Sequence, residues 1–161
     1  MTLQRAEVYR LLDRVLDEES RLLAQLEALL REETAILGRN QIDEISRIGS
    51  SRQGCVEALT RLEAERTDCC RMLSFGQGGG ALLKLYDWCN DDGSLAQRWR
   101  ANLDIARRCQ QLNDGNGAIV VAKLSRVQKL LMAVRGSAAP PVYSARGARY
   151  GNFGSRDFGR A

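Results

Sequence analysis

The chain has 161 residues, of which 44% are hydrophobic and 27% charged, a length and composition that fit one domain of ordinary size. It contains no histidine, so the commonest general base and the commonest metal ligand are both missing. We therefore expect neither an enzyme nor a protein that holds a metal or another cofactor. No N-terminal signal region and no long apolar run occur, which predicts a cytoplasmic protein.

The net charge of +4 hides an asymmetry between the two parts of the chain. Residues 1–97 hold 12 basic and 17 acidic side chains, whereas residues 98–161 hold 12 basic and 3 acidic ones. A basic C-terminal part can complement an acidic protein surface, a phosphate backbone or an anionic lipid surface. The charge by itself does not choose among these partners.

The first predicted element is a long helix between residues 3 and 37. Hydrophobic residues recur there every seven positions over five repeats, which is typical of a helix whose stripe faces a neighbouring helix. Gly38 is predicted to end this helix in the left-handed conformation, and Asn40 to cap the next helix. The two seven-residue ladders are Val8, Val15, Leu22, Leu29 and Ile36, and Tyr9, Leu16, Leu23, Leu30 and Leu37.

A second helix is predicted from residue 41 to about residue 73, with a less regular seven-residue seam. The two helices form an antiparallel hairpin over about residues 3–73, because the chain has to turn back between them. Four charged residues occupy the seams, and we interpret them as cross-helix pairs that fix the register of the hairpin and contribute little if exposed. They are Glu19 and Glu33 on the first helix and Arg52 and Arg66 on the second.

Glycines at 76–80, 93 and 115–117 mark predicted loops between later helices, which lie at about 81–90, at 94–112 and in the last stretch before residue 136. Ser94 and Gln97 are predicted to form a capping box. Both prolines, Pro140 and Pro141, follow the last helix. The predicted fold class is therefore all-α, a long antiparallel helical hairpin packed with later helices, at about 81–135, into an elongated bundle over residues 1–136.

The last predicted helix carries a narrow apolar stripe with spacings of 4, 3, 4 and 3 residues. A stripe of this width is typical of a helix that docks against one other helix. It could close the bundle, or it could accept an amphipathic helix of a partner. The pattern leaves both alternatives open. The stripe consists of Val120, Leu124, Val127, Leu131 and Val134.

Two further features invite a chemical interpretation, and neither supports one. The five cysteines show no Cys-x-x-Cys spacing, which predicts free thiols that pack as small hydrophobic residues in a reducing cytosol. The glycine run at 76–80 differs from phosphate-binding loops because it follows a helix and is not followed by Lys-Ser or Lys-Thr. We predict a linker there.

Residues 137–161 are a predicted flexible tail rich in Pro, Gly, Arg and aromatic residues. Arginines and aromatics in such a mixture are typical of segments that stack on single-stranded nucleic acid. Two alternatives to a protein-binding function therefore stay open. One is a nucleic-acid-binding helical protein that uses its basic C-terminal half, and the other is a structural coiled-coil oligomer in which self-association consumes every stripe.

These segments, over about residues 5–147, resemble the FlgN family of flagellar export chaperones. The similarity rests on the N-terminal helical hairpin and on three short motifs. The motifs are Leu62-Glu63-Ala64-Glu65-Arg66, then Asn113, Asn116 and Gly117 at the opening of the last helix, and finally Tyr143 and Gly147 after the prolines.

The resemblance implies a cytosolic chaperone without ATP or catalysis. Such a protein binds the C-terminal segments of hook-filament junction proteins, keeps them monomeric and delivers them to the flagellar type III export gate or to components of the ATPase complex. A small-molecule substrate is not expected, nor is nucleic acid. The implied partner contacts lie on the last helix and its flanks, at Asn113, Asn116, Gly117, Val120, Leu124, Val127, Leu131, Val134 and Tyr143.

Overall fold

The structure is a computed structural model that describes residues 5–90 and 92–136, apart from the side chain of Ile42. The described part consists of four helices and contains no strand. They are α1 (Arg5–Arg39), α2 (Ile42–Met72), α3 (Gly79–Cys89) and α4 (Ser94–Arg135). This confirms the predicted all-α class.

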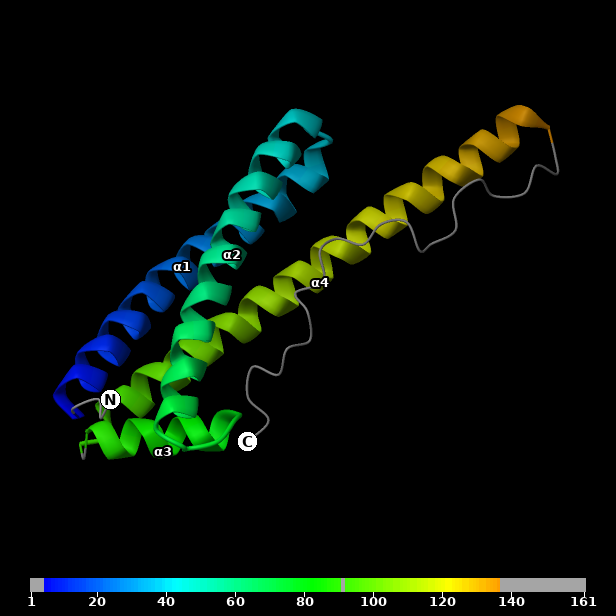
Figure 1. Cartoon of the computed structure of the whole chain (residues 1–161). Helices are drawn as coiled ribbons and strands as arrows, with labels where there is room; N and C mark the ends of the chain where they lie inside the picture. The colour runs from blue at the N-terminus through cyan, green and yellow to red at the C-terminus, as the bar shows by residue number, and fades with distance from the viewer. Residues whose placement is uncertain (1–4, 91, 137–161) are drawn as a thin grey trace.

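The predicted hairpin is formed by α1 and α2, which run antiparallel and side by side (Figure 1). Helix α1 packs along most of its length against both α2 and α4. Helix α3 is short and lies across the end of the bundle opposite the turn between α1 and α2 (Figure 1). Helix α4 begins beside α3, runs back along α1, and its last turns extend beyond that turn (Figure 1).

Two apolar clusters fill the bundle, and α1 contributes to both. One lies at the α3 end, where Tyr86 and Trp99 pack with their ring centroids 5.8 Å apart. The other lies between the middle parts of α1, α2 and α4 and contains Leu26, Leu59 and Cys109. The seven-residue ladders of α1 supply both clusters because that period keeps one stripe of the helix facing its neighbours.

The turn of the hairpin differs from the prediction by two residues. Gly38 is still inside α1, and Asn40 takes the left-handed conformation, with a φ of 57°. Gln41, not Asn40, stands at the N-terminus of α2. Asparagine is among the few residues other than glycine that adopt this conformation at modest cost, so α1 continues past Gly38 and the chain reverses at Asn40.

The prediction that glycines 115–117 form a loop was wrong, because α4 is continuous across them. Each glycine inside a helix costs about 1 kcal/mol relative to alanine, which made a break plausible. The helix persists because Asn116 is buried against α1 and donates hydrogen bonds to Leu30 O at 3.0 Å and to Glu33 Oε2 at 2.8 Å. Tertiary contacts of this kind outweigh a weak local preference.

The predicted capping box at Ser94 and Gln97 was also wrong. Ser94 is the first residue of α4, and Gly93 precedes it in the left-handed conformation. The Ser94 backbone N–H donates to Asp92 Oδ1 at 2.8 Å, and Asn90 Nδ2 donates to Ser94 Oγ at 2.8 Å. The carboxylate that accepts a hydrogen bond from the first backbone N–H of α4 is therefore that of Asp92, in the preceding turn.

All five cysteines are buried free thiols, as predicted from the sequence. Burial raises the pKa of Cys89 and of Cys109 to about 11. Because the pKa of these thiols is higher in the folded protein, their contribution to the free energy of unfolding is complete below the ordinary thiol pKa near 9.0. This contribution is lost as the pH rises toward 11.

We expect five thiols per chain to react with a thiol reagent after denaturation, and very slow reaction of the native protein at neutral pH. We also expect the free energy of unfolding, measured with urea, to fall between pH 9 and pH 11. The fall should be shallower in Cys109→Ala than in the unsubstituted chain. A native disulfide, or equal pH dependence in both proteins, would contradict this account.

Candidate partner-binding surface

The most exposed apolar surface of the described chain lies on the last four turns of α4. We call residues 121–135 the projecting segment, because it passes the end of the hairpin formed by α1 and α2 (Figure 1). Large apolar residues exposed elsewhere in the described chain are Met72 and Trp88. Those exposed on the projecting segment are Val121, Leu124, Val127, Leu130, Leu131, Met132 and Val134.

From Asn102 to Lys123, near the start of this segment, α4 is held to α1 by a row of polar contacts with a period of seven, which we call the polar ladder. Asn102, Cys109, Asn116 and Lys123 each donate a hydrogen bond to a backbone carbonyl of α1. The acceptors are the carbonyl oxygens of Leu16, Leu23, Leu30 and Leu37, taken in the same order. The constant spacing means that α1 and α4 keep one parallel register along the whole contact.

Buried carboxylates reinforce two of these rungs. Glu19 accepts from Asn102 Nδ2 at 2.9 Å and from Arg66 Nη1 of α2 at 2.9 Å. All three of these residues are buried. The rung therefore joins α1, α2 and α4 through one carboxylate, at a depth where an unpaired charge would be costly.

The second carboxylate lies two seven-residue repeats further along. Glu33, 1% exposed, accepts from Asn116 Nδ2 at 2.8 Å and pairs with Arg52 Nη1 at 3.5 Å. Arg52 also donates to Asn113 Oδ1 at 3.0 Å. The interpretation that these seam charges form cross-helix pairs is therefore confirmed, and both pairs are far less exposed than surface salt bridges.

The residues predicted to bind a partner fall into two groups in the structure. Asn113 and Asn116 lie inside the bundle and bond within the chain, while Gly117 and Val120 are half-buried where the hairpin ends. The other members of the predicted stripe are exposed, and Tyr143 lies outside the described residues. These exposed members are Leu124, Val127, Leu131 and Val134.

Three residues of the surface were missed because they lie outside the predicted 4-3 stripe. Val121 and Met132 extend the exposed apolar surface on one side of the helix and Leu130 extends it on the other. At about 100° per residue, the exposed apolar residues from Leu130 to Met132 span roughly 200° of the helix circumference, with Lys123, Gln128 and Arg135 among them. The apolar sequence Leu130-Leu131-Met132 was the available signal for this width.

The projecting segment is also basic. Residues 115–136 contain four basic residues and no acidic ones. Arg126 and Lys129 are exposed on it and form no ion pair with any residue between 5 and 136 that the structure describes. The surface therefore offers a partner an apolar band bordered by positive charge.

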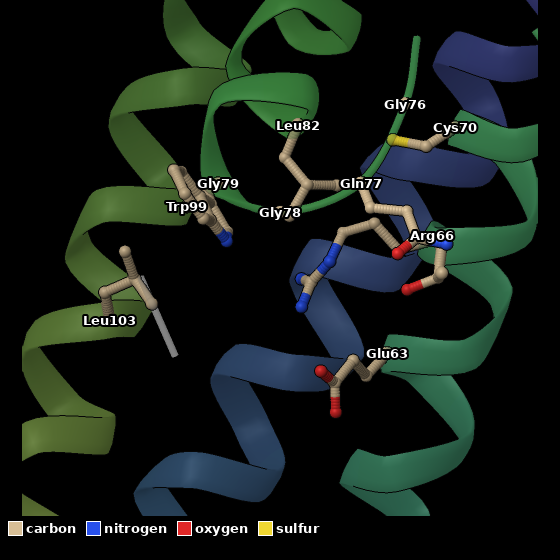
Figure 2. A pocket seen from close by; sticks show the side chains of 11 residues that line it. Glu63, Arg66, Cys70, Gly76, Gln77, Gly78, Gly79, Leu82, Trp99 and Leu103 are labelled. Carbon is tan, nitrogen blue, oxygen red and sulfur yellow. The ribbon is translucent and has the colours of Figure 1, made fainter. Parts of the chain in front are cut away.

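The glycine run before α3 borders a small cavity of about 90 Å³ at the other end of the molecule. Figure 2 shows Arg66 reaching from α2 beneath this loop, with Trp99 and Leu103 of α4 on the opposite wall. Arg66 is already paired with Glu19, and Glu63 also lines the cavity. These charges do not favour an anion there, in keeping with the linker predicted from the sequence.

Within the described part of the chain, no group of three or more histidine, cysteine or acidic residues is arranged to hold a metal ion. In the same residues, no helix is both long and apolar enough to cross a membrane. The surface that distinguishes the described structure is thus the projecting segment. An elongated helical bundle with such a surface defines a helical protein-binding protein.

A family model described as FlgN protein matches residues 9–151, which is most of the chain. The chain therefore belongs to the FlgN family, and its general role is that of a flagellar export chaperone. No match was found among curated proteins or among solved structures.

Proposed function

We propose that this protein is a cytoplasmic chaperone that binds the C-terminal segments of hook-filament junction proteins and delivers them to the type III export gate. It has no catalytic activity and uses no cofactor. The observation that carries the proposal is the projecting segment, where seven large apolar side chains are exposed on one helix end. Family membership supplies the flagellar export context, and the apolar helix supplies a surface suited to an amphipathic segment.

Exposure of this kind is unusual for a surface that has no partner. Contiguous exposed apolar patches on soluble proteins commonly mark interaction sites. Burying the side chains of Leu124, Val127 and Leu131 would contribute on the order of 1 kcal/mol or more each, before the costs of association are subtracted. A chaperone that covers an aggregation-prone segment needs this type of surface on itself.

Each alternative meets an observation that weighs against it. Self-association through the projecting segments would bring together two helix ends that carry four basic residues each and no acidic ones. Nucleic acid would use the same basic residues but would leave the seven apolar side chains exposed. A protein partner with both apolar and acidic groups uses the whole surface.

The test is co-expression of the full chain with C-terminal segments of candidate hook-filament junction proteins, followed by size-exclusion chromatography with mass measurement. A stable one-to-one complex supports the proposal. Failure with every such segment refutes the cargo class. Binding to RNA or DNA with an affinity that falls steeply with salt, together with no cargo complex, supports the nucleic-acid alternative.

The tail yields a separate prediction, based on the sequence alone. We expect deletion of residues 149–161 to leave the affinity for cargo within about threefold, because this segment has no apolar periodicity and its arginines add only nonspecific attraction. We expect Tyr143→Ala to weaken binding either to cargo or to the export gate. Loss of cargo binding on truncation, with no effect of Tyr143→Ala, would reverse the assignment.

A further inference from the structure

Glycine is distributed unevenly along the three long helices. The parts of α1, α2 and α4 that lie toward α3 contain none, and these parts are residues 5–29, 55–72 and 94–112. Every glycine of the three helices lies in the remaining parts, toward or beyond the level of the hairpin turn (Figure 1). They are Gly38 of α1, Gly49 and Gly54 of α2, and Gly115 and Gly117 of α4.

Packing does not explain these glycines. A methyl group added at any of the five would meet nothing within 4 Å apart from its chain neighbours and the backbone of its own helix. Each position lies within a helix and none has a positive φ, so alanine can adopt the same backbone conformation. Because glycine weakens a helix relative to alanine, these positions lower the stability of one end of the bundle without a steric reason.

The glycines of α2 and α4 flank one polar group that joins the three long helices. Arg52, which lies between Gly49 and Gly54 in the sequence, donates to Asn113 Oδ1 of α4 at 3.0 Å and pairs with Glu33 of α1 at 3.5 Å. Asn116, which lies between Gly115 and Gly117, donates to Glu33 Oε2 at 2.8 Å. Glu33 Oε1 is buried and accepts no hydrogen bond from any residue that the structure describes. The weakest helical sequence of α2 and α4 therefore surrounds an incompletely satisfied polar group.

The apolar clusters of the bundle lie nearer to α3 than this polar group. Their members reach as far as Leu30 of α1, Cys55 of α2 and Leu112 of α4. Burial of apolar surface therefore contributes less to the stability of the hairpin-turn end than to that of the α3 end. The described apolar side chains that are buried beyond the clusters are Ile36, Leu37 and Ile48.

We propose that the hairpin-turn end of the bundle is a conformational device that opens as one unit while the α3 end stays folded. We call this part, residues 31–54 and 113–123, the turn-end unit. Its opening separates the polar group, breaks the last rung of the polar ladder at Lys123, and uncovers the buried apolar side chains beside the projecting segment. The inference rests on the glycines and on these contacts, and it is independent of the proposed function.

The three segments of the turn-end unit are expected to open together because each depends on the other two. When Asn116 leaves α1, the buried Glu33 carboxylate loses a hydrogen-bond donor, which is unfavourable while it stays buried. Each segment is also shorter than about 15 residues, and a helix of that length is marginal in water without packing. Loss of one segment therefore removes the contacts that keep the other two helical.

Hydrogen exchange of the full chain, measured amide by amide by NMR spectroscopy, tests the unit. We expect amides of the turn-end unit to exchange through an opening about 100-fold or more frequent than the opening that exposes amides nearer to α3. One common opening constant for both sets would overturn the inference. The first set is residues 33–37, 46–54 and 114–120, and the second is residues 12–26, 59–69 and 99–109.

The double variant Gly49→Ala with Gly54→Ala distinguishes a cooperative unit from separate fraying of the helix ends. We expect it to slow exchange about tenfold or more in α2 and by an equal factor at residues 114–120 of α4, because the segments open together. The reciprocal variant, Gly115→Ala with Gly117→Ala, should slow exchange at residues 46–54 in the same way. If either variant slows exchange in its own helix alone, the segments open separately and the inference is wrong.

Gly80→Ala is the matched control. It makes the same change in the first turn of α3, where an added methyl group also meets nothing within 4 Å. We expect exchange at residues 114–120 to stay within about twofold of the unsubstituted chain, because the opening of the turn-end unit leaves α3 folded. Equal slowing by the control and by the α2 variant would overturn the inference, since both would then act on global unfolding. Unchanged circular dichroism verifies that each variant keeps its helix content.

Discussion

Replacing Arg66 by methionine is expected to lower the free energy of unfolding by about 3–5 kcal/mol. Arg66 is 2% exposed and its guanidinium donates to Glu19 Oε1 at 2.9 Å. Without it, Glu19 keeps a hydrogen bond from Asn102 but loses the only cation that the described structure places against it. A carboxylate left in this position is destabilised far more than one at the surface. Urea denaturation followed by circular dichroism measures the loss.

The double variant Glu19→Leu with Arg66→Met separates the charge from the packing. Its free energy of unfolding is expected to lie within about 1–2 kcal/mol of the unsubstituted chain, because removing both charges also removes their desolvation cost. Asn102 retains its hydrogen bond to Leu16 O at 3.2 Å in that variant. Arg71→Met is the control, since its pair with Asp68 is exposed and should contribute less than about 1 kcal/mol. Equal effects of Arg66→Met and Arg71→Met would contradict the account.

Leu124→Asp is expected to weaken cargo binding by about 100-fold or more while leaving the helix content nearly unchanged. The side chain is 49% exposed in the free protein, so a charge there is solvated until a partner covers it. On binding, the carboxylate would be desolvated against an apolar partner surface without a matching cation, at a cost of several kcal/mol. Co-purification and calorimetry with the cargo segment measure the change.

The matched control is Met72→Asp, which places the same charge on an exposed apolar residue at the C-terminal end of α2. We expect it to bind cargo with unchanged affinity. If Leu124→Asp lowers the melting temperature by many degrees and Met72→Asp does not, then Leu124 belongs to a core, and cargo has to bind elsewhere. If both leave binding unchanged, the projecting segment is not the cargo surface.

The hairpin was predictable because its signal is repeated. Ladders such as Leu16, Leu23, Leu30 and Leu37 hold a seven-residue period through α1, and no single substitution hides it. The seam charges were predictable for the same reason, since Glu19 and Glu33 interrupt otherwise apolar positions. Family membership was also readable from the sequence, and the match over residues 9–151 confirms it.

The candidate surface was predictable only in part. The stripe through Leu124, Val127 and Leu131 has a helical period, but the same period fits a helix that closes the bundle and one that leaves it. Whether these side chains are exposed depends on where the hairpin ends relative to α4. That position is set by contacts between residues more than 80 positions apart in the sequence. Val121, Leu130 and Met132 were missed because they lie outside the 4-3 stripe, although the run Leu130-Leu131-Met132 was visible in the sequence.

The sequence by itself determined the helical class, the hairpin, the buried character of the cysteines and the basic charge of the last helix, because each depends on local periodicity or composition. Only the tertiary structure decided that α4 is continuous through Gly115 and Gly117 and that Asn102 and Asn116 donate hydrogen bonds to carbonyl groups of α1. It also decided that α4 extends past the end of the hairpin. These features depend on contacts between residues distant in the chain, whose free energies exceed the local preference of a glycine or an asparagine.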